Sequence, residues 1–238
     1  MSKGILAIAK LNLRNIESAY FSAAITAFIM FALVMIIYII TVSSGNVQNS
    51  SISGPGNAIY LILIIAAITI PTGNFRRVIN LGGRRENFFW GTLAAYAILT
   101  VAASLANNIV FYTFDTFMQN SGYFGTGGGS TNIMQAFGWT QNGFVIAFFQ
   151  QAAFMFLLSI FIHTFVSVQG KLLGWTVNFI FVAVLAVFIS IATLRQTLVQ
   201  FFNLIIFHDT AMVQIVVCIV LALAIYMLNK PIYVRKAI

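Results

Sequence analysis

The sequence predicts an all-α polytopic membrane protein with six transmembrane helices, and three observations support this fold class. Hydrophobic residues make up 61% of the 238 residues and charged residues only 7%, whereas a water-soluble domain needs roughly 25% charged residues to cover its surface. Apolar stretches recur along the chain, and their length is close to the ~20 residues that a helix needs to cross a bilayer. Lys and Arg cluster at the ends of those stretches, so lipid is the expected surroundings of the apolar surface.

The chain begins with a segment, residues 1–15 (MSKGILAIAKLNLRN), in which apolar residues are interspersed with Lys3, Lys10 and Arg14. This pattern predicts an amphipathic helix that lies in the inner headgroup region. A disordered leader is the alternative that the pattern leaves open.

Six apolar segments follow, and each is predicted to form one spanning helix. Their ranges are 18–42, 57–72, 88–114, 143–168, 175–194 and 211–228. The three prolines, Pro55, Pro71 and Pro231, fall at the ends of these segments, which favours uninterrupted helices. The whole chain, 1–238, is therefore expected to form a single membrane domain.

The segment 195–210 (RQTLVQFFNLIIFHDT), which precedes the last span, is apolar between Arg195 and the pair His208-Asp209. It is predicted to form a short re-entrant hairpin that dips into the outer leaflet, where its backbone needs protein or water around it. An extension of the fifth helix is the alternative.

The distribution of basic residues predicts the orientation. With the N-terminus inside, one basic residue, Arg195, falls outside and eleven fall inside. The inner ones are Lys3, Lys10, Arg14, Arg76, Arg77, Arg84, Arg85, Lys171, Lys230, Arg235 and Lys236. Because cytoplasmic connections carry the excess of Lys and Arg, both termini are predicted to be cytoplasmic. The net charge of +8 therefore reflects topology, and no nucleic-acid partner is expected.

The connection between the second and third spans, residues 74–90 (NFRRVINLGGRRENFFW), is the most informative segment of the chain. It contains four of the twelve basic residues and is longer than a helical hairpin needs. The pair Gly82-Gly83 divides it into two short basic pieces. Its apolar face consists of Phe75, Val78, Ile79 and Leu81. This pattern predicts a short helix below the membrane that docks into a cytoplasmic partner, and a positive-inside anchor without a partner is the alternative.

Few polar residues lie within the predicted spans. The polar residues singled out are Asn107, Asn108, Gln150, Gln151, His163, Asn178 and Gln214. One interpretation is hydrogen bonding between helices, which is worth ~0.6 kcal/mol per bond on average. The other is that these residues line a path for an amphipathic substrate. The lone histidine, His163, is more often a packed, hydrogen-bonded residue in such a position than a proton relay.

Enzymatic chemistry is not indicated. The sequence contains no G-x-x-x-x-G-K-[ST] phosphate-binding loop, so the chain is not expected to hydrolyse ATP itself. Its four acidic residues lie at segment ends or in connections, and no metal-ligand or catalytic set can be assembled by spacing. We therefore expect no cofactor, metal or catalytic residue on this chain.

The stretch FRRVINLGGRRENFFWG is similar to the pattern R-x-x-x-x-L-G-x-x-R-x-x-F-F of small Gram-positive permeases. The amphipathic N-terminal segment, the six spans and the apolar segment before the last span belong to the same overall pattern, which covers nearly the whole chain. The chain thus resembles the ABC-2-type permease family, and in particular the permeases that export peptide toxins and bacteriocins.

The resemblance implies that residues 74–87 form the coupling helix that contacts a cytoplasmic ATP-binding cassette subunit. The residues carried over to that contact are Arg76, Arg77, Leu81, Gly82, Gly83, Arg84, Arg85 and Glu86. It also implies an elbow helix at 1–15, outer re-entrant helices at 195–210, and pairing with a second permease copy in a homodimer or a heterodimer. ATP and Mg²⁺ are then expected on the partner ATPase subunit.

The function that this resemblance implies is the permease subunit of an ATP-driven exporter in a bacterial cytoplasmic membrane. The implied substrate is hydrophobic or amphipathic, with a peptide as the expected class. Two alternatives stay open: a permease that protects the cell against an antimicrobial peptide, and a channel or membrane scaffold that uses no ATP.

Overall fold

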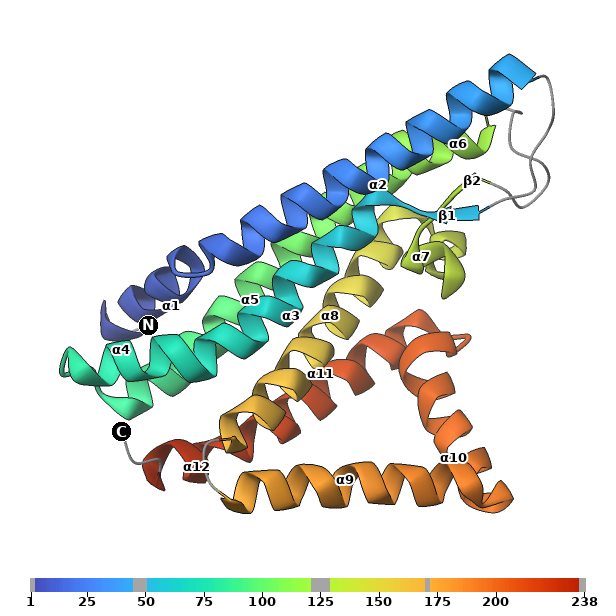
Figure 1. The fold of residues 1–238 in the computed structure, drawn as a ribbon. Coiled ribbons are helices and arrows are strands. Elements are labelled where there is room, and N and C mark those ends of the chain that lie inside the picture. Colours follow the sequence, from blue (N-terminus) through green and yellow to red (C-terminus); the bar gives the residue numbers. More distant parts are fainter. Residues whose placement is uncertain (1–2, 45–50, 121–128, 170–171, 236–238) are drawn as a thin grey trace.

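A computed structural model describes residues 3–44, 51–120, 129–169 and 172–235 of the chain. Long helices dominate the fold (Figure 1). Within the described residues, five helical runs are long and apolar enough to cross a membrane, and there are up to six if one strongly bent helix pair is counted as a single span. The prediction of a helical chain with several membrane-length segments is therefore confirmed, and the count of six depends on the bent pair.

The elements follow one another with short connections. The α-helices are α1 (Lys3–Arg14), α2 (Glu17–Ser44), α3 (Ile59–Thr69), α4 (Phe75–Asn80), α5 (Arg85–Val110), α6 (Thr116–Asn120), α7 (Ile133–Ala136), α8 (Gly143–Val168), α9 (Leu172–Ser190), α10 (Ala192–Phe202), α11 (Ala211–Met227) and α12 (Asn229–Arg235). The 3₁₀ helices are η1 (Pro55–Ala58) and η4 (Trp139–Asn142), and the π-helices are η2 (Ile70–Asn74), η3 (Phe111–Asp115) and η5 (Asn203–Phe207). The strands are β1 (Ser51–Ser53) and β2 (Gly129–Thr131).

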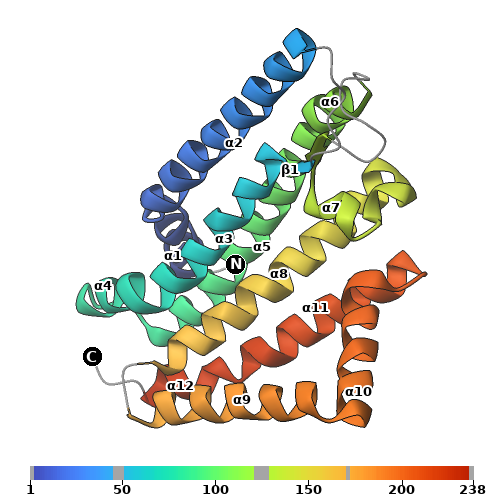
Figure 2. The ribbon, with the colours of Figure 1, turned by 45° about the vertical axis from the view of Figure 1, so that its right-hand side comes forward.

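A bundle of α3, α5, α8 and α11 forms the centre of the molecule, with α8 in contact with the other three (Figures 1 and 2). The core contains fully buried side chains from each of these helices, such as Leu63, Tyr96, Met155 and Cys218. The predicted spans 88–114, 143–168 and 211–228 correspond to α5 with η3, α8, and α11. Each of these predominantly apolar segments is bordered by a polar residue on both sides.

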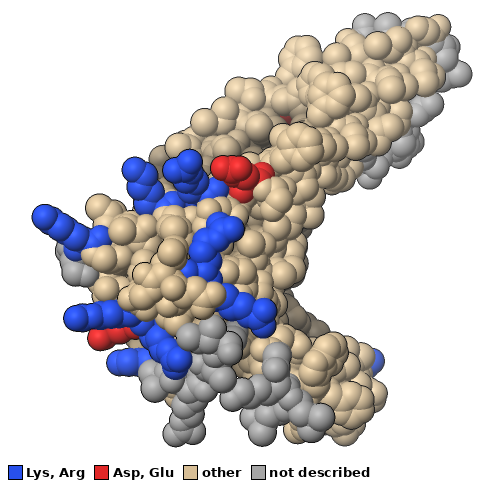
Figure 3. Space-filling view, turned by 60° about the vertical axis from the view of Figure 1, so that its left-hand side comes forward, with Lys and Arg blue, Asp and Glu red and all other residues tan. Residues whose placement is uncertain are grey.

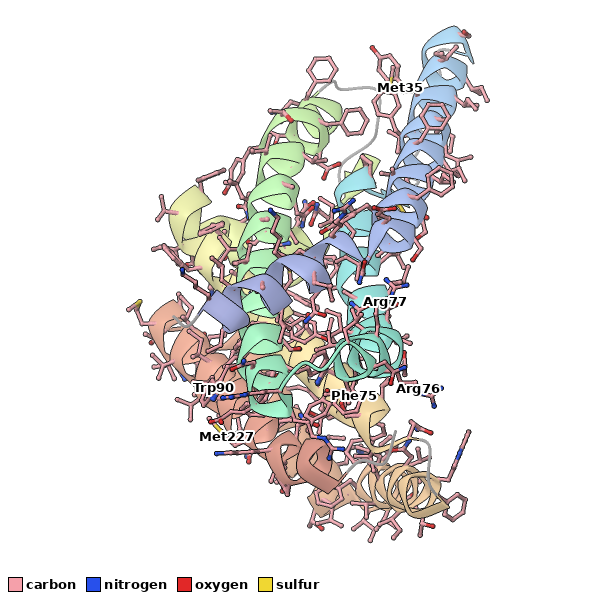
Figure 4. All side chains as sticks on the ribbon, turned by 90° about the vertical axis from the view of Figure 1, so that its left-hand side faces the viewer. Met35, Phe75, Arg76, Arg77, Trp90 and Met227 are labelled. Carbon is pink, nitrogen blue, oxygen red and sulfur yellow. The ribbon has the colours of Figure 1, made fainter. Side chains whose placement is uncertain are left out.

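The amphipathic N-terminal segment forms α1, which lies across α5 (Figure 4). One face of α1 is buried, with Ile8, Ala9 and Asn12 against the bundle. Close approach depends on Gly91 of α5, because a Cβ there would lie 2.9 Å from the Ile5 carbonyl oxygen. The helix is therefore anchored to protein along one side, and its position at the inner membrane surface stays a prediction.

The second predicted span, 57–72, does not end where the sequence predicted, and this changes the structure of the connection 74–87. The helix does not end at Pro71 but continues through η2 into α4, so that one helical run extends from Pro55 to Asn80. Proline has no backbone N–H to donate, and a local π-turn is one of the adjustments by which a membrane helix tolerates it. The expectation that all prolines lie at segment ends was wrong for Pro71, and the non-helical part of the connection is limited to 81–84.

The fifth predicted span, 175–194, covers most of α9 and extends across the break at residue 191 into the first turn of α10. Residues 195–207 form the remainder of α10 and η5. The run 174–190 is bent by 107° from the run 192–207 (Figure 1). Aromatic side chains of α9 are strongly exposed, with Trp175 at 69% and Phe179 at 77%. The bend thus lies before the segment 195–210, whose residues 195–207 continue one helical run, and the re-entry of this segment into a leaflet stays a prediction.

At the end of the bundle opposite α4, the strands β1 and β2 pair in parallel, with Ile52 opposite Ser130 (Figure 1). The pairing continues past the strands, where the Gly54 N–H donates to the Thr131 carbonyl at 2.7 Å. The Asn57 side chain donates to the same carbonyl at 3.0 Å. The all-α expectation is therefore correct for the spans, while the connections contain a small parallel ladder that composition did not predict.

Candidate functional site: the basic end and its link to the bundle

Lys and Arg side chains gather at one end of the molecule (Figure 3). This end contains α1, α4 and α12, and both chain ends lie near it (Figure 1). The side chains of Lys10, Arg14, Arg76, Arg77 and Arg84 are exposed there. These residues of the predicted inner set therefore lie at one end of the molecule, Lys171 and Lys236 lie outside the described residues, and the side of the membrane that this end faces stays a prediction.

The turn between α4 and α5 has the hydrogen bonds of a Schellman cap. The Gly83 N–H donates to the Val78 carbonyl at 2.9 Å, and the Gly82 N–H donates to the Ile79 carbonyl at 3.0 Å. Gly82 has φ +78°, the left-handed conformation that glycine adopts without a steric penalty. A Cβ on Gly83 would lie 2.8 Å from the Val78 carbonyl oxygen. Both glycines of the predicted break are therefore required by the shape of the turn.

The surface of this turn presents one apolar side chain among charged ones. Leu81 is 76% exposed, and Arg84 and Glu86 beside it are exposed as well. Arg76 and Arg77 lie on the outer side of α4, whereas Phe75 lies toward the bundle (Figure 4). We refer to Arg76, Arg77, Leu81, Gly82, Gly83, Arg84 and Glu86 as the tip surface.

The apolar face that the sequence predicted for docking is divided by the structure. Phe75 is 1% exposed and Val78 is 5% exposed, because both pack into the hydrophobic core. Ile79 is half-buried against the same core. Of these four predicted apolar residues, Leu81 is the one whose side chain is largely available to a partner.

Tyr233 of α12 packs against the base of the helical hairpin that α4 and α5 form, which we call the tip hairpin. Its ring centroid lies 5.0 Å from that of Phe75 and 5.5 Å from that of Phe88. Its backbone carbonyl accepts a hydrogen bond from the Arg85 guanidinium at 3.2 Å. Arg85, which the family resemblance placed in the partner contact, is therefore engaged within the chain, and sequence reasoning missed Tyr233 because it lies 148 residues away.

The hydroxyl of Tyr233 continues this connection into α8. It lies 2.7 Å from Nε2 of His163 and 3.1 Å from the Ser167 hydroxyl. The other ring nitrogen of His163, Nδ1, lies 2.8 Å from the Tyr96 hydroxyl of α5. Burial raises the pKa of Tyr233, so its phenol stays protonated at neutral pH and is available as a donor. His163 is thus fully buried and hydrogen-bonded at both ring nitrogens.

Toward the opposite end, Gln151 of α8 joins α3 and α5. Its Oε1 accepts hydrogen bonds from Asn108 at 2.9 Å and from Ser104 at 3.1 Å. Its Nε2 donates to the Tyr60 hydroxyl at 3.1 Å. All of these side chains are buried, so the network connects three helices of one chain.

A second network fixes the π-helix η5 to the bundle. Gln150 Nε2 donates to Gln214 Oε1 at 2.5 Å, and Gln214 Nε2 donates to the Ile205 carbonyl at 3.1 Å. The indole of Trp139 donates to the neighbouring Ile206 carbonyl at 2.9 Å. A π-turn leaves carbonyl groups outside the regular helical pattern, and these side chains supply donors for them.

A third network contains Asn107, which is one of the predicted polar residues, together with Asn132 and Asp115, which are not among them. Asn107 and Asn132 exchange hydrogen bonds at 2.9 and 3.3 Å, and Asn132 Nδ2 also donates to Asp115 at 3.2 Å. Asn132 further accepts from the Met134 N–H as the N-cap of α7. Its position before an apolar run is the capping signal that could have identified it.

The seven predicted polar residues are thus distributed over separate places. Asn107, Asn108, Gln150, Gln151, His163 and Gln214 are buried in the networks above. Asn178 is half-buried on α9, whose contacts are chiefly with α10. Within the described ranges, no three His, Cys, Asp or Glu side chains are placed to hold a metal ion.

Comparisons with protein-family models, curated proteins and solved structures find no match for the chain.

Proposed function

We propose that the chain is the membrane-spanning permease subunit of an ATP-driven exporter in a bacterial cytoplasmic membrane, with both termini in the cytoplasm. The observation that carries the proposal is Leu81, which is 76% exposed on a rigid turn among exposed arginines at the basic end. In the proposed orientation this side chain projects into water. The proposal treats this side chain as the apolar centre of a protein contact and the surrounding arginines as its polar rim.

The tip surface is the proposed contact for a cytoplasmic ATP-binding cassette subunit. Arginine forms strong, bidentate hydrogen bonds with carboxylates, so an acidic rim around an apolar pocket is the surface that would fit Leu81, Arg76 and Arg84. Arg85 is assigned a positioning role instead, because its guanidinium binds the Tyr233 carbonyl. ATP and Mg²⁺ belong to the partner subunit in this proposal.

Movement of the tip can reach the bundle through Tyr233. The ring of Tyr233 packs on Phe75 of α4, and its hydroxyl binds His163 of α8. A partner that binds the tip differently in its ATP and ADP states would shift this connected unit between two arrangements. The π-helix η2 joins α3 to α4, and the proposal places the bending of the helix at this point during the shift, because π-turns interrupt the regular helical pattern.

The proposed substrate path lies between two copies of the permease. Six of the seven predicted polar residues are buried and hydrogen-bonded within the chain, which supports a structural role for them. The proposal therefore does not assign these residues to the path. The proposed substrate class is a hydrophobic or amphipathic peptide. A permease for self-protection against an antimicrobial peptide would use the same geometry.

The proposal is tested by purifying the tagged chain from native membranes in mild detergent and identifying the proteins that co-elute. We expect a soluble partner that contains a phosphate-binding loop sequence. The double substitution Leu81→Ala with Arg84→Ala should reduce its recovery at least tenfold while membrane insertion is unchanged.

The matched control is Leu228→Ala with Lys230→Ala, an exposed apolar–basic pair at the same end. This control should retain the partner. Equal loss in both variants would show that general charge or folding, and not the tip surface, governs recovery. Purification of a folded chain without any such partner would overturn the exporter proposal in favour of a channel or scaffold.

A further inference from the structure

A groove of about 480 Å³ lies beside the corner at which α1 ends and α2 begins. Its lining consists of Ala7, Lys10, Leu11, Arg14, Asn15 and Glu17. Its volume falls within the range of ~300–1,000 Å³ that is typical of small-molecule sites. The groove is separate from the tip surface, so an inference about it does not depend on the proposed ATPase partner.

The corner that shapes the groove is held by defined contacts. Ile16 is fully buried, and its carbonyl accepts a hydrogen bond from the Ala19 N–H at 2.9 Å. The Tyr20 hydroxyl donates to the Leu13 carbonyl at 3.2 Å, which ties the first turn of α2 to α1. Asn12 in turn donates to the Thr92 hydroxyl of α5 at 3.0 Å. The groove is therefore formed before a ligand binds, and the free-energy cost of ordering it on binding is small.

The polar groups of the groove suit a phosphodiester. Lys10 and Arg14 contribute two positive charges and Glu17 one negative charge, so the lining has a net charge of +1, since 2 − 1 = 1. Lysine and arginine both form charge-assisted hydrogen bonds with phosphate oxygens, and arginine can form two of them in parallel.

An apolar stripe extends from the groove along α2. Glu17, Phe21, Ile25 and Phe28 follow one another at intervals of four, four and three residues, which places them on one face of the helix. Phe21 is 70% exposed, Ile25 is 44% exposed and Phe28 is 71% exposed. A molecule with its charged group in the groove would therefore find an apolar surface for a long hydrocarbon chain directly beside it.

We propose that this groove binds an anionic phospholipid with a single phosphodiester charge, of the phosphatidylglycerol type, in the leaflet at the basic end. Lys10 and Arg14 hold the phosphate, and an acyl chain lies along the stripe of Phe21, Ile25 and Phe28. Glu17 limits the groove to one net positive charge, which matches one phosphodiester.

The test is native mass spectrometry of the purified full chain, titrated with phosphatidylglycerol that has two 14-carbon chains. We expect one tightly held lipid per chain. Substitution Lys10→Ala with Arg14→Ala should weaken that binding about 30-fold, since each cation near a membrane surface favours an anionic lipid about fivefold. Glu17→Gln should strengthen it, because the groove then has a net charge of +2.

The charge-matched control is Lys3→Ala with Lys230→Ala, which removes two exposed cations at the same end and leaves the groove intact. It should bind the lipid as the unmodified chain does. Equal weakening in this control, or equal affinity for phosphatidylethanolamine with the same chains, would overturn the proposal.

Inorganic phosphate distinguishes a lipid site from a simple anion site. Millimolar phosphate should not displace the lipid, because it lacks the acyl chains that contact α2. Displacement at that concentration would mean that the groove binds free phosphate, and the lipid assignment would be wrong. The opposite effects expected from Glu17→Gln and from the double alanine variant keep the test informative if one of them folds poorly.

Discussion

The hydroxyl of Tyr233 lies 2.7 Å from Nε2 of His163, and this hydrogen bond joins the C-terminal helix to α8. Both residues are buried, at 1% and 0% exposure. Because the Tyr233 ring also packs on Phe75 of α4, the residue is shared by the tip hairpin, the terminal helix and a central span. Such a residue is placed to transmit movement among the three, and its substitution should affect all of them.

Replacement Tyr233→Phe should destabilise the fold by about 1–3 kcal/mol, because His163 and Ser167 each lose a buried hydrogen-bond partner. The measurement is the Tm of the purified chain in detergent. The same change at Tyr20, whose hydroxyl makes an exposed hydrogen bond, is the control and should change Tm little. Equal shifts in the two variants would contradict a special role for the buried hydroxyl.

Replacement Gly56→Ala should destabilise the end of the bundle opposite α4. The new Cβ would overlap Asn107 Oδ1 and lie 2.8 Å from Asn132 Nδ2, and overpacking of this kind costs about 1–3 kcal/mol. Gly73→Ala serves as the control, because a Cβ there meets nothing within 4 Å. We expect a lower Tm for the first variant and an unchanged or higher Tm for the second. A Gly56→Ala variant as stable as the unmodified chain would show that the Asn107–Asn132 pair is loosely held.

Replacement Gly82→Ala should loosen the turn at the tip, because a left-handed backbone costs an alanine about 1–2 kcal/mol. Local opening should then be about 5–30-fold more frequent, and trypsin cleavage in the tip correspondingly faster. Gly82→Asn should restore most of the protection, since asparagine tolerates this conformation better. Identical cleavage rates for alanine and asparagine would argue against the capping interpretation.

The orientation can be measured with single cysteines in a Cys218→Ala background. The exposed residues Asn80 and Gln141 are suitable positions near opposite ends of the bundle. A membrane-impermeant maleimide added to intact cells should label Gln141→Cys, and it should label Asn80→Cys only after permeabilisation. The reverse pattern would place the tip surface outside the cell and exclude a cytoplasmic partner for it.

The spans could be predicted because hydrophobic length is a local property of the chain. The predicted span 143–168 coincides with α8, and the predicted span 211–228 ends one residue beyond α11. The strongly bent run around residue 191 was not predicted, since an apolar sequence is compatible with either a straight or a bent helix. The continuation of a helix past Pro71 was also missed, because a π-turn has no sequence signature of its own.

The candidate site was predictable only in part. The basic residues and the glycines of the tip were evident from the sequence, because charge excess and left-handed turns select particular residue types. The sequence did not show that Leu81 is exposed while Phe75 is buried. The short helix α4 has only six residues, and the elements packed around it determine which of its side chains are buried.

By itself, the sequence determined that this protein has a helical, membrane-type architecture, where its apolar segments lie and which of them end in basic residues. Those properties follow from hydrophobicity and charge counted along the chain. Only the tertiary structure decided that Tyr233 meets His163 and that Arg85 is engaged within the chain. These contacts join residues through the packing of separate helices, and the pattern of a single segment contains no information about which side chains from other segments will face it.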